Sequence, residues 1–79
     1  MDRNEITNKL TEIFRDVFSD ATLVATDEMT SDDVQKWDSL SHMQLITVIE
    51  KQFGIKFKLK EILSWQNVGT MINCIEKKL

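Results

Sequence analysis

Few residues in this chain have side chains that could take part in chemistry. Asp38 and Ser39 place a carboxylate beside a hydroxyl, His42 is the only histidine, and Cys74 is the only cysteine. A helix start is predicted at Ser39, which would occupy the N-cap or the first turn. At that position a serine oxygen can accept a hydrogen bond from a free backbone N–H. The same N–H groups and the helix dipole also suit a phosphate.

No catalytic set of residues can be recognised in the sequence. The chain has no tyrosine, no glycine-rich phosphate loop and no metal-ligand spacing. An acidic stretch begins at Asp27, but its third position is Met29 and no central glycine follows, so calcium binding of the EF-hand type is not expected. A helical domain of this size is expected to leave little room for a substrate pocket of the usual volume. The chain is therefore predicted to be acted on by enzymes rather than to be one.

Apolar residues recur at helical spacing in three stretches, which predicts an all-α fold. Asp2 or Asn4 could cap the first helix, Gly54 would stop the second, and Asn67 would cap the last. The absence of proline and of any sheet pattern favours a small up-and-down bundle of three main helices plus one short helix, in a single domain of residues 1–79. The predicted helices span residues 3–18, 39–53, 61–65 and 67–79.

Two connecting segments carry apolar residues that are expected to hold them against the helices. Residues 19–38 form a loop long enough to be functional, with a short helical turn predicted at residues 30–33. This loop is expected to run the length of the bundle and to leave Ser39 at one end. Residues 55–60 alternate apolar and basic side chains, which predicts an extended segment with its apolar side chains inward. The expected anchors are Leu23, Val24, Met29, Val34, Trp37, Ile55, Phe57 and Leu59.

The second helix has a wider apolar arc than one core contact requires. One tight face is predicted to lie in the core, and His42 falls near its middle, whereas Leu40 and Met43 lie to one side. Two interpretations of Leu40 and Met43 remain open. They could form a partner surface, or they could pack beneath the long loop. The predicted core face comprises Leu45, Ile46, Ile49 and Phe53.

Asp38-Ser39-Leu40, at the junction of loop and helix, resembles the attachment site of acyl carrier proteins. The resemblance covers nearly the whole chain, including the long first loop and the Glu50-Lys51-Gln52-Phe53-Gly54 close of the second helix. It implies that a phosphopantetheinyl transferase uses coenzyme A to attach a 4′-phosphopantetheine arm to Ser39. The thiol of that arm would hold an acyl group as a thioester. Asp38 would lie beside the phosphate and help the transferase hold its metal or orient the site, and Leu40 would contact partners.

The resemblance also implies that the second helix is the recognition surface for acyl-loading and acyl-transfer enzymes. Ser41, Gln44 and Lys51 stand where the familiar bacterial fatty-acid pattern has acids. A dedicated partner set is therefore expected, in a specialised lipid, polyketide or related biosynthetic cluster. A peptidyl carrier remains an alternative, as does a helical interaction module in which Ser39 is only an N-cap. The residues expected to face partners are Leu40, Met43, Gln44, Thr47, Glu50 and Lys51.

His42 and Cys74 have less specific predictions. His42 is either a neutral side chain satisfied within the core or part of the wall of a cavity near the tethered acyl group. In the second case, a polar group there would favour short or polar acyl chains over long plain ones. Cys74 is expected to be a half-buried thiol with no chemical role, because no histidine or metal ligand accompanies it.

The charge distribution bears on partners and location. The net charge is −3, and residues 1–38 contain ten acidic and four basic residues, so nucleic acid is not an expected partner. No apolar run approaches the length of a membrane span, and no signal peptide is recognisable at the N-terminus. A cytoplasmic monomer without membrane insertion is predicted.

Overall fold

Four α-helices and one short 3₁₀-helix form the fold, and the chain contains no strand. The computed structural model describes residues 1–79, so every part of the chain can be placed. The all-α prediction of three main helices and one short helix is confirmed. The predicted limits of the second helix are also confirmed, whereas the short helix begins two residues earlier than predicted. The elements are α1 (Arg3–Val17), η1 (Ser31–Asp33), α2 (Ser39–Phe53), α3 (Leu59–Ser64) and α4 (Val68–Lys78).

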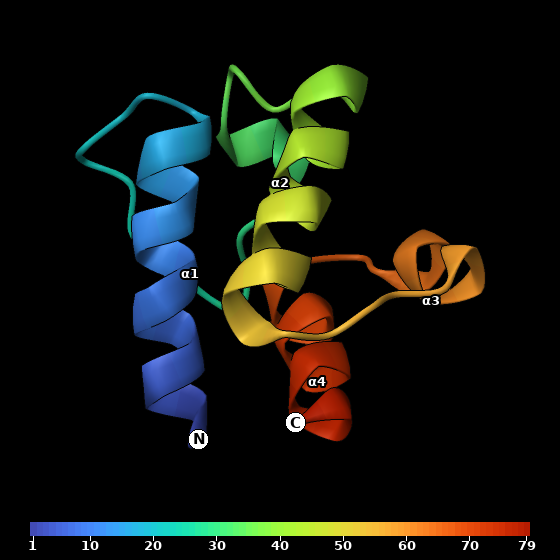
Figure 1. Ribbon diagram of the computed structural model, residues 1–79. Coiled ribbons are helices and arrows are strands. Elements are labelled where there is room, and N and C mark those ends of the chain that lie inside the picture. Colours follow the sequence, from blue (N-terminus) through green and yellow to red (C-terminus); the bar gives the residue numbers. More distant parts are fainter.

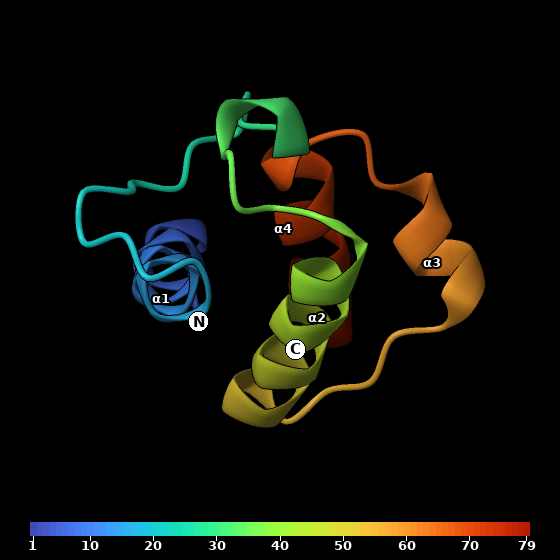
Figure 2. The same cartoon turned by 90° about the horizontal axis from the view of Figure 1, so that it is seen from above.

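The helices are arranged so that Ser39 lies at one end of the bundle. In Figure 1, α1 runs toward the end at which α2 begins, and both α2 and α4 run back toward the chain termini. Arg3 and Glu76 form an ion pair of 2.6 Å, which joins the first helix to the last at the opposite end. Figure 2 shows α1 and α3 on opposite sides of α2 and α4. Ser39, at the start of α2, thus lies at the end of the bundle away from the chain termini.

Side chains at the helix ends explain where the helices begin and stop. Asp2, rather than Asn4, caps α1 by accepting a hydrogen bond of 2.9 Å from the Glu5 N–H. Gly54 ends α2 in the left-handed conformation, with φ of 65°, which glycine adopts at little cost. Asn67 caps α4 by accepting from the Thr70 N–H at 2.9 Å. The predicted stop at Gly54 and cap at Asn67 are confirmed.

The core consists of the apolar faces of α1, α2 and α4, as predicted. Trp37 from the long loop joins this core, with its ring centroid 5.5 Å from that of Phe14 and 5.3 Å from that of Phe18. Leu79, the last residue of the predicted fourth helix, lies beyond the end of α4 and is exposed. The helical core residues include Ile6, Leu10, Ile13, Phe14, Leu45, Ile46, Ile49, Phe53, Val68, Met71, Ile72 and Ile75.

The loop between α1 and α2 does not simply run the length of the bundle. It leaves the end of α1, reaches the start of α4, and returns to the start of α2. The Asp27 and Met29 carbonyls accept hydrogen bonds of 2.9 Å from the Gly69 and Val68 N–H groups, respectively. The predicted turn at residues 30–33 is confirmed as η1, which Thr30 caps. The loop therefore contacts the fourth helix before it presents Ser39.

Four of the five anchors predicted in this loop are confirmed. Val34 is buried, and Leu23, Met29 and Trp37 pack against the core. Val24 was a wrong prediction, because it is exposed and its neighbour Ala25 is buried instead. Successive side chains of an extended segment point to opposite sides, so only one of such a pair can face the core.

The segment after α2 is extended only as far as α3. Ile55 is buried and Phe57 packs against the core, as predicted. Leu59 was predicted to point inward, but its side chain is 71% exposed. The cause is that the Glu61 carboxylate accepts a hydrogen bond of 2.8 Å from the Lys58 N–H and starts α3 at Leu59. From this point the helical period replaces the alternation of an extended chain.

Candidate functional site

Asp38, and not Ser39, caps the second helix. The Asp38 carboxylate accepts from the Ser41 N–H at 2.9 Å, and the Ser41 hydroxyl accepts from the Asp38 N–H at 2.8 Å. Ser39 is therefore the first helical residue, and its predicted alternative role as the N-cap is wrong. The Ser39 side chain is exposed and makes no hydrogen bond within the chain. Its hydroxyl is free to react.

The Asp38 carboxylate is held in its charged form. The hydrogen bond from the Ser41 N–H lowers the pKa of Asp38 below its ordinary value. The negative charge also lies at the N-terminus of α2, where the helix dipole favours it. A stable carboxylate thus adjoins the free Ser39 hydroxyl.

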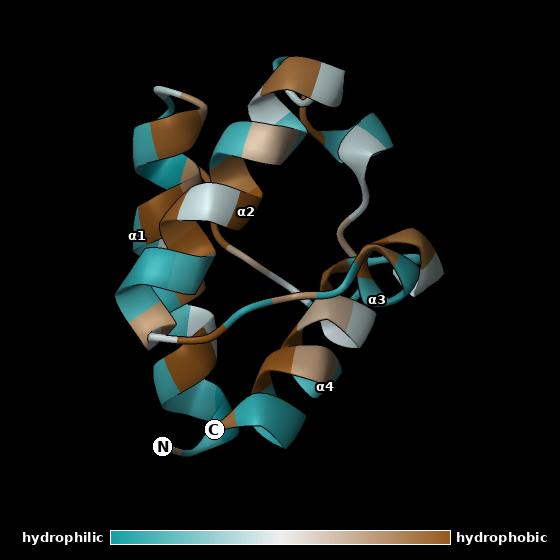
Figure 3. Ribbon diagram, turned by 45° about the vertical axis from the view of Figure 1, so that its right-hand side comes forward, coloured by the Kyte–Doolittle hydropathy of each residue, from teal (hydrophilic) through white to brown (hydrophobic).

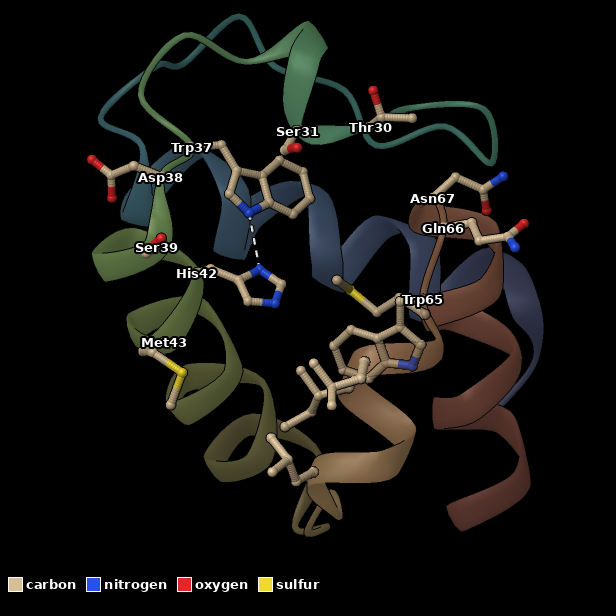
Figure 4. A pocket seen from close by; sticks show the side chains of 14 residues that line it. Thr30, Ser31, Trp37, Asp38, Ser39, His42, Met43, Trp65, Gln66 and Asn67 are labelled. Atoms are coloured by element: carbon tan, nitrogen blue, oxygen red, sulfur yellow. Dashed lines mark hydrogen bonds between the residues drawn. The ribbon is translucent and has the colours of Figure 1, made fainter.

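A cavity of about 690 Å³ opens beside Ser39. It lies between the start of α2, α3, η1 and the connection from α3 to α4, with Asp38 and Ser39 on one rim (Figure 4). The expectation that so small a domain has little room for a pocket is wrong. The space exists because α3 packs against α4, while its backbone stays more than 8 Å from that of α2 between Cα atoms. The volume falls within the range of small-molecule sites.

Aromatic side chains form the walls of this cavity. His42 lies between Trp37 and Trp65, with ring centroids 6.0 Å from the former and 6.3 Å from the latter. The rings of Trp65 and Phe57 are nearly perpendicular, with centroids 4.9 Å apart. His42 was predicted near the middle of the core face, but it lies outside the core and is only half-buried. Its alternative placement in a cavity wall agrees with the structure.

The hydrogen bond between Trp37 and His42 fixes the state of the imidazole. The Trp37 indole N–H donates to His42 Nδ1 at 3.0 Å (Figure 4). An indole N–H can only donate, so Nδ1 accepts and the ring proton is on Nε2. Burial lowers the pKa of His42, so the imidazole is neutral near pH 7.

Exposed apolar side chains surround the mouth of the cavity. Leu40 is 72% exposed and Met43 is 57% exposed, so the interpretation that they pack beneath the long loop is wrong. Leu59 and Leu63 are exposed on α3, and Figure 3 shows the hydrophobic patches on that helix. Met43, Leu59 and Leu63 line the cavity, whereas Leu40 lies outside it.

The other residues expected to face partners do not have equivalent environments. Gln44, Thr47 and Lys51 are exposed on α2. Glu50 is half-buried, and its carboxylate accepts a hydrogen bond of 2.7 Å from the Phe57 N–H. Glu50 therefore holds the segment after α2, a role that sequence reasoning missed.

Trp37 and Trp65 are the site residues that sequence reasoning did not identify. The sequence indicates Trp37 only as a loop anchor, and it indicates Trp65 only as the last residue of the short helix predicted over residues 61–65. His42 follows Ser39 by about one helical turn, and that spacing was the available signal for a shared site. The tryptophans lie in irregular segments, where no periodicity indicates which surface a side chain faces.

Cys74 and the acidic residues add no second site. The Cys74 thiol is half-buried, lies 3.6 Å from the Glu61 carboxylate, and has its pKa raised by burial. The Glu61 carboxylate is paired with Lys78 at 2.9 Å. Histidine, cysteine and acidic side chains nowhere gather in threes as a metal would require.

None of the helices has the length and apolar character needed to cross a membrane.

The fold and the site together define a small helical carrier domain that presents a serine hydroxyl at a helix start. The family model described as the phosphopantetheine attachment site matches residues 8–75. The solution NMR structure of a holo acyl carrier protein from Geobacter metallireducens is similar, with a TM-score of 0.87 and 44% sequence identity. The match covers 91% of this chain and 83% of that one. A comparison with curated proteins gave no match.

This chain belongs to the acyl carrier protein family. It holds 4′-phosphopantetheine covalently and is a carrier rather than an enzyme. Like other acyl carrier proteins, it is a substrate of phosphopantetheinyl transferase and interacts with acyl-handling enzymes. The alternative of an unmodified interaction module is wrong. The free hydroxyl at the rim of a sizeable cavity fits a flexible arm that carries a cargo.

Proposed function

We propose that Ser39 carries the phosphopantetheine arm and that the chain serves a specialised lipid, polyketide or related biosynthetic cluster. The observation that supports this assignment is the free Ser39 hydroxyl. It is exposed in the first turn of α2, while Asp38 supplies the cap that a serine would otherwise provide. The hydroxyl can therefore be esterified without loss of the hydrogen bonds that start the helix.

The residues around Ser39 suit a phosphodiester at that position. In the transfer from coenzyme A, the Ser39 hydroxyl would lose its proton and form the bond to the phosphorus next to the pantetheine, while the pyrophosphate P–O bond of coenzyme A breaks and adenosine 3′,5′-bisphosphate leaves. The backbone N–H of Ser39 has no hydrogen-bond partner, and with the α2 dipole it stabilises the negative phosphate. The Asp38 carboxylate would repel that phosphate, so it is suited to hold a cation of the transferase during the reaction. The bound arm supplies a thiol that keeps acyl groups as thioesters.

The proposed partner surface is the exposed side of α2 next to the cavity mouth. Leu40 and Met43 provide apolar contacts, and Gln44, Thr47 and Lys51 provide polar ones. The lack of acids among these exposed residues supports a dedicated set of partner enzymes over the general fatty-acid enzymes, because charge complementarity selects partners.

The single domain over residues 1–79, the monomeric state and the cytoplasmic location also remain predictions.

The attachment residue can be tested by intact mass. The purified protein is incubated with coenzyme A and a broad-specificity phosphopantetheinyl transferase. The expected result is a gain of one phosphopantetheine in the wild type and none in Ser39→Ala. Ser31→Ala is the matched control, because Ser31 also lines the cavity but lies in η1, and it should be modified normally. Modification of Ser39→Ala would contradict the assignment.

A further inference from the structure

One wall of the cavity presents a hydrogen-bond donor of fixed direction. Trp37 donates to His42 Nδ1, which leaves the proton of the neutral imidazole on Nε2. Figure 4 shows this second ring nitrogen directed toward the space between α2 and α3. The donor therefore faces the region beside Ser39 in which a tethered group would lie.

The Nε2–H group has no partner within the chain and remains accessible. Trp65 Nε1 is the only side-chain nitrogen or oxygen that is both buried and without a hydrogen bond. His42 Nε2, which also has no partner in the chain, is therefore open to the cavity rather than buried. Its hydrogen bond is made with water until another acceptor replaces that water.

The cost of covering this donor depends on the chemistry of the group that covers it. A plain alkyl chain placed over Nε2–H removes water and offers no acceptor, which leaves a desolvated donor unpaired. A hydroxyl or keto oxygen can accept the hydrogen bond and avoids that cost. A site with such a donor therefore discriminates between oxygen-bearing and plain acyl chains more strongly than an apolar pocket of the same shape.

We propose that His42 Nε2–H donates a hydrogen bond to a hydroxyl or keto oxygen on the acyl chain, beyond the thioester carbonyl. The cavity would then retain short hydroxyacyl or oxoacyl groups in preference to plain ones. This inference rests on attachment of the arm at Ser39. Trp37 is the positioning residue, because its indole N–H selects the tautomer that carries the proton on Nε2. Trp37 and Trp65 flank the imidazole and confine the acyl group beside it.

The inference can be tested by NMR of the histidine side chain in ¹⁵N-labelled protein. Four forms are compared: apo, holo, butyryl-loaded and 3-hydroxybutyryl-loaded, each confirmed by intact mass. In every form we expect Nδ1 without a proton and Nε2 with one. With the hydroxyacyl group, the Nε2 proton should shift downfield because it is hydrogen-bonded. Its exchange with solvent should slow about tenfold relative to the butyryl form, which is the effect expected of one additional hydrogen bond.

The alternative outcomes separate the two proposals. Failure to load any group would contradict attachment at Ser39. Successful loading with identical histidine signals in the butyryl and 3-hydroxybutyryl forms would overturn the inference and leave the attachment intact. A full shift already present in the holo form would identify an amide oxygen of the arm as the acceptor and would also overturn the proposed preference.

Substitutions test the same idea with a different readout. Loaded proteins are treated with hydroxylamine, and each rate is divided by that of the corresponding free pantetheine thioester. The wild type should protect 3-hydroxybutyryl more than butyryl. His42→Phe keeps a ring but lacks the donor, and should abolish the difference, whereas His42→Gln keeps a donor and should retain part of it. Trp37→Phe should give a mixture of histidine tautomers. An unchanged difference in His42→Phe would overturn the inference.

Discussion

Ser39 is available for modification because a neighbouring residue supplies the cap that the helix needs. Asp38 and Ser41 satisfy each other through two hydrogen bonds, of 2.8 and 2.9 Å. The serine between them is therefore not required for helix formation. An arm attached to Ser39 can be added or removed while the start of α2 stays in place.

The neutral state of His42 links stability to pH. Its pKa is lowered from 6.5 in the folded protein by burial, and no charged group contributes to that shift. As pH falls, the unfolded chain takes up the proton before the folded chain does. The contribution of the neutral imidazole to the free energy of unfolding is therefore complete above about pH 6.5 and declines below it. We expect the urea midpoint to be lower at about pH 5 than at about pH 7.5.

His42→Gln is the matched variant for this measurement, because it removes the titrating group and keeps a polar side chain. Its urea midpoint should change less between the two pH values than that of the wild type. The carboxylates with lowered pKa, those of Asp20, Asp38 and Glu61, titrate below this window and affect both proteins equally. An equal pH dependence in the two proteins would show that another group is responsible.

Helix α2 has separate faces for the core and for partners. Its buried side chains pack against α1, whereas Leu40 and Met43 remain exposed. Since exposed side chains contribute little to folding, changes on this face should alter binding without altering stability.

The proposed partner surface can be tested by alanine substitution. Leu40→Ala and Met43→Ala should leave the thermal midpoint nearly unchanged and slow modification by the phosphopantetheinyl transferase, seen as a lower kcat/KM. Val24→Ala is the control, because Val24 is an apolar residue about as exposed as Met43 and lies in the loop between α1 and α2. Equal rates for all three variants and the wild type would exclude this surface from the transferase complex.

The loop between α1 and α2 depends on one buried hydrogen bond to α1. The Ala25 N–H donates to the Thr11 hydroxyl at 3.0 Å, and both residues are buried. Thr11→Val keeps the shape but leaves this N–H unpaired, so the free energy of unfolding should fall by about 1–3 kcal/mol. Urea unfolding measures the loss. Thr11→Ser keeps the hydroxyl and should lose less, and a larger loss in Thr11→Ser would contradict this explanation.

The main helices were predictable because local signals specify them, whereas the loops were not. Asn67 and Gly54 mark helix ends by chemistry that acts within a few residues. The path of the loop depends instead on hydrogen bonds to α4, about 40 residues later in the chain. The same limit applies to the site. The helical residues Ser39 and His42 were predicted, but the cavity required knowledge of where α3 lies.

At the scale of the whole molecule, Arg3 joins three distant parts of the chain. Its guanidinium contacts Glu76 at 2.6 Å, Asn73 at 2.8 Å and Asp27 at 3.3 Å. The first helix, the long loop and the last helix are thereby held together at the end opposite Ser39. The planar guanidinium can reach several acceptors at once, which a lysine ammonium group cannot do with the same geometry.

Removal of this network should destabilise the protein modestly. Arg3→Ala is expected to lower the free energy of unfolding by about 1 kcal/mol, because the contacts are partly exposed and partly ionic. The difference from the wild type should shrink at high salt, which screens the ion pairs. Lys77→Ala, at an exposed position of α4, is the control and should have little effect in urea unfolding. A salt-independent loss would assign the effect to packing.

The hydrogen bonds between the loop and α4 make two amide protons reporters of a distant event. The Val68 and Gly69 N–H groups lie in the first turn of α4, where amides usually exchange quickly with solvent, yet each donates to a loop carbonyl. A Cβ at position 69 would lie only 3.1 Å from the Asp27 carbonyl oxygen, so glycine permits this close approach. Deuterium uptake at these two amides would therefore reveal whether attachment of the arm, or release of its cargo, loosens the loop that leads into Ser39.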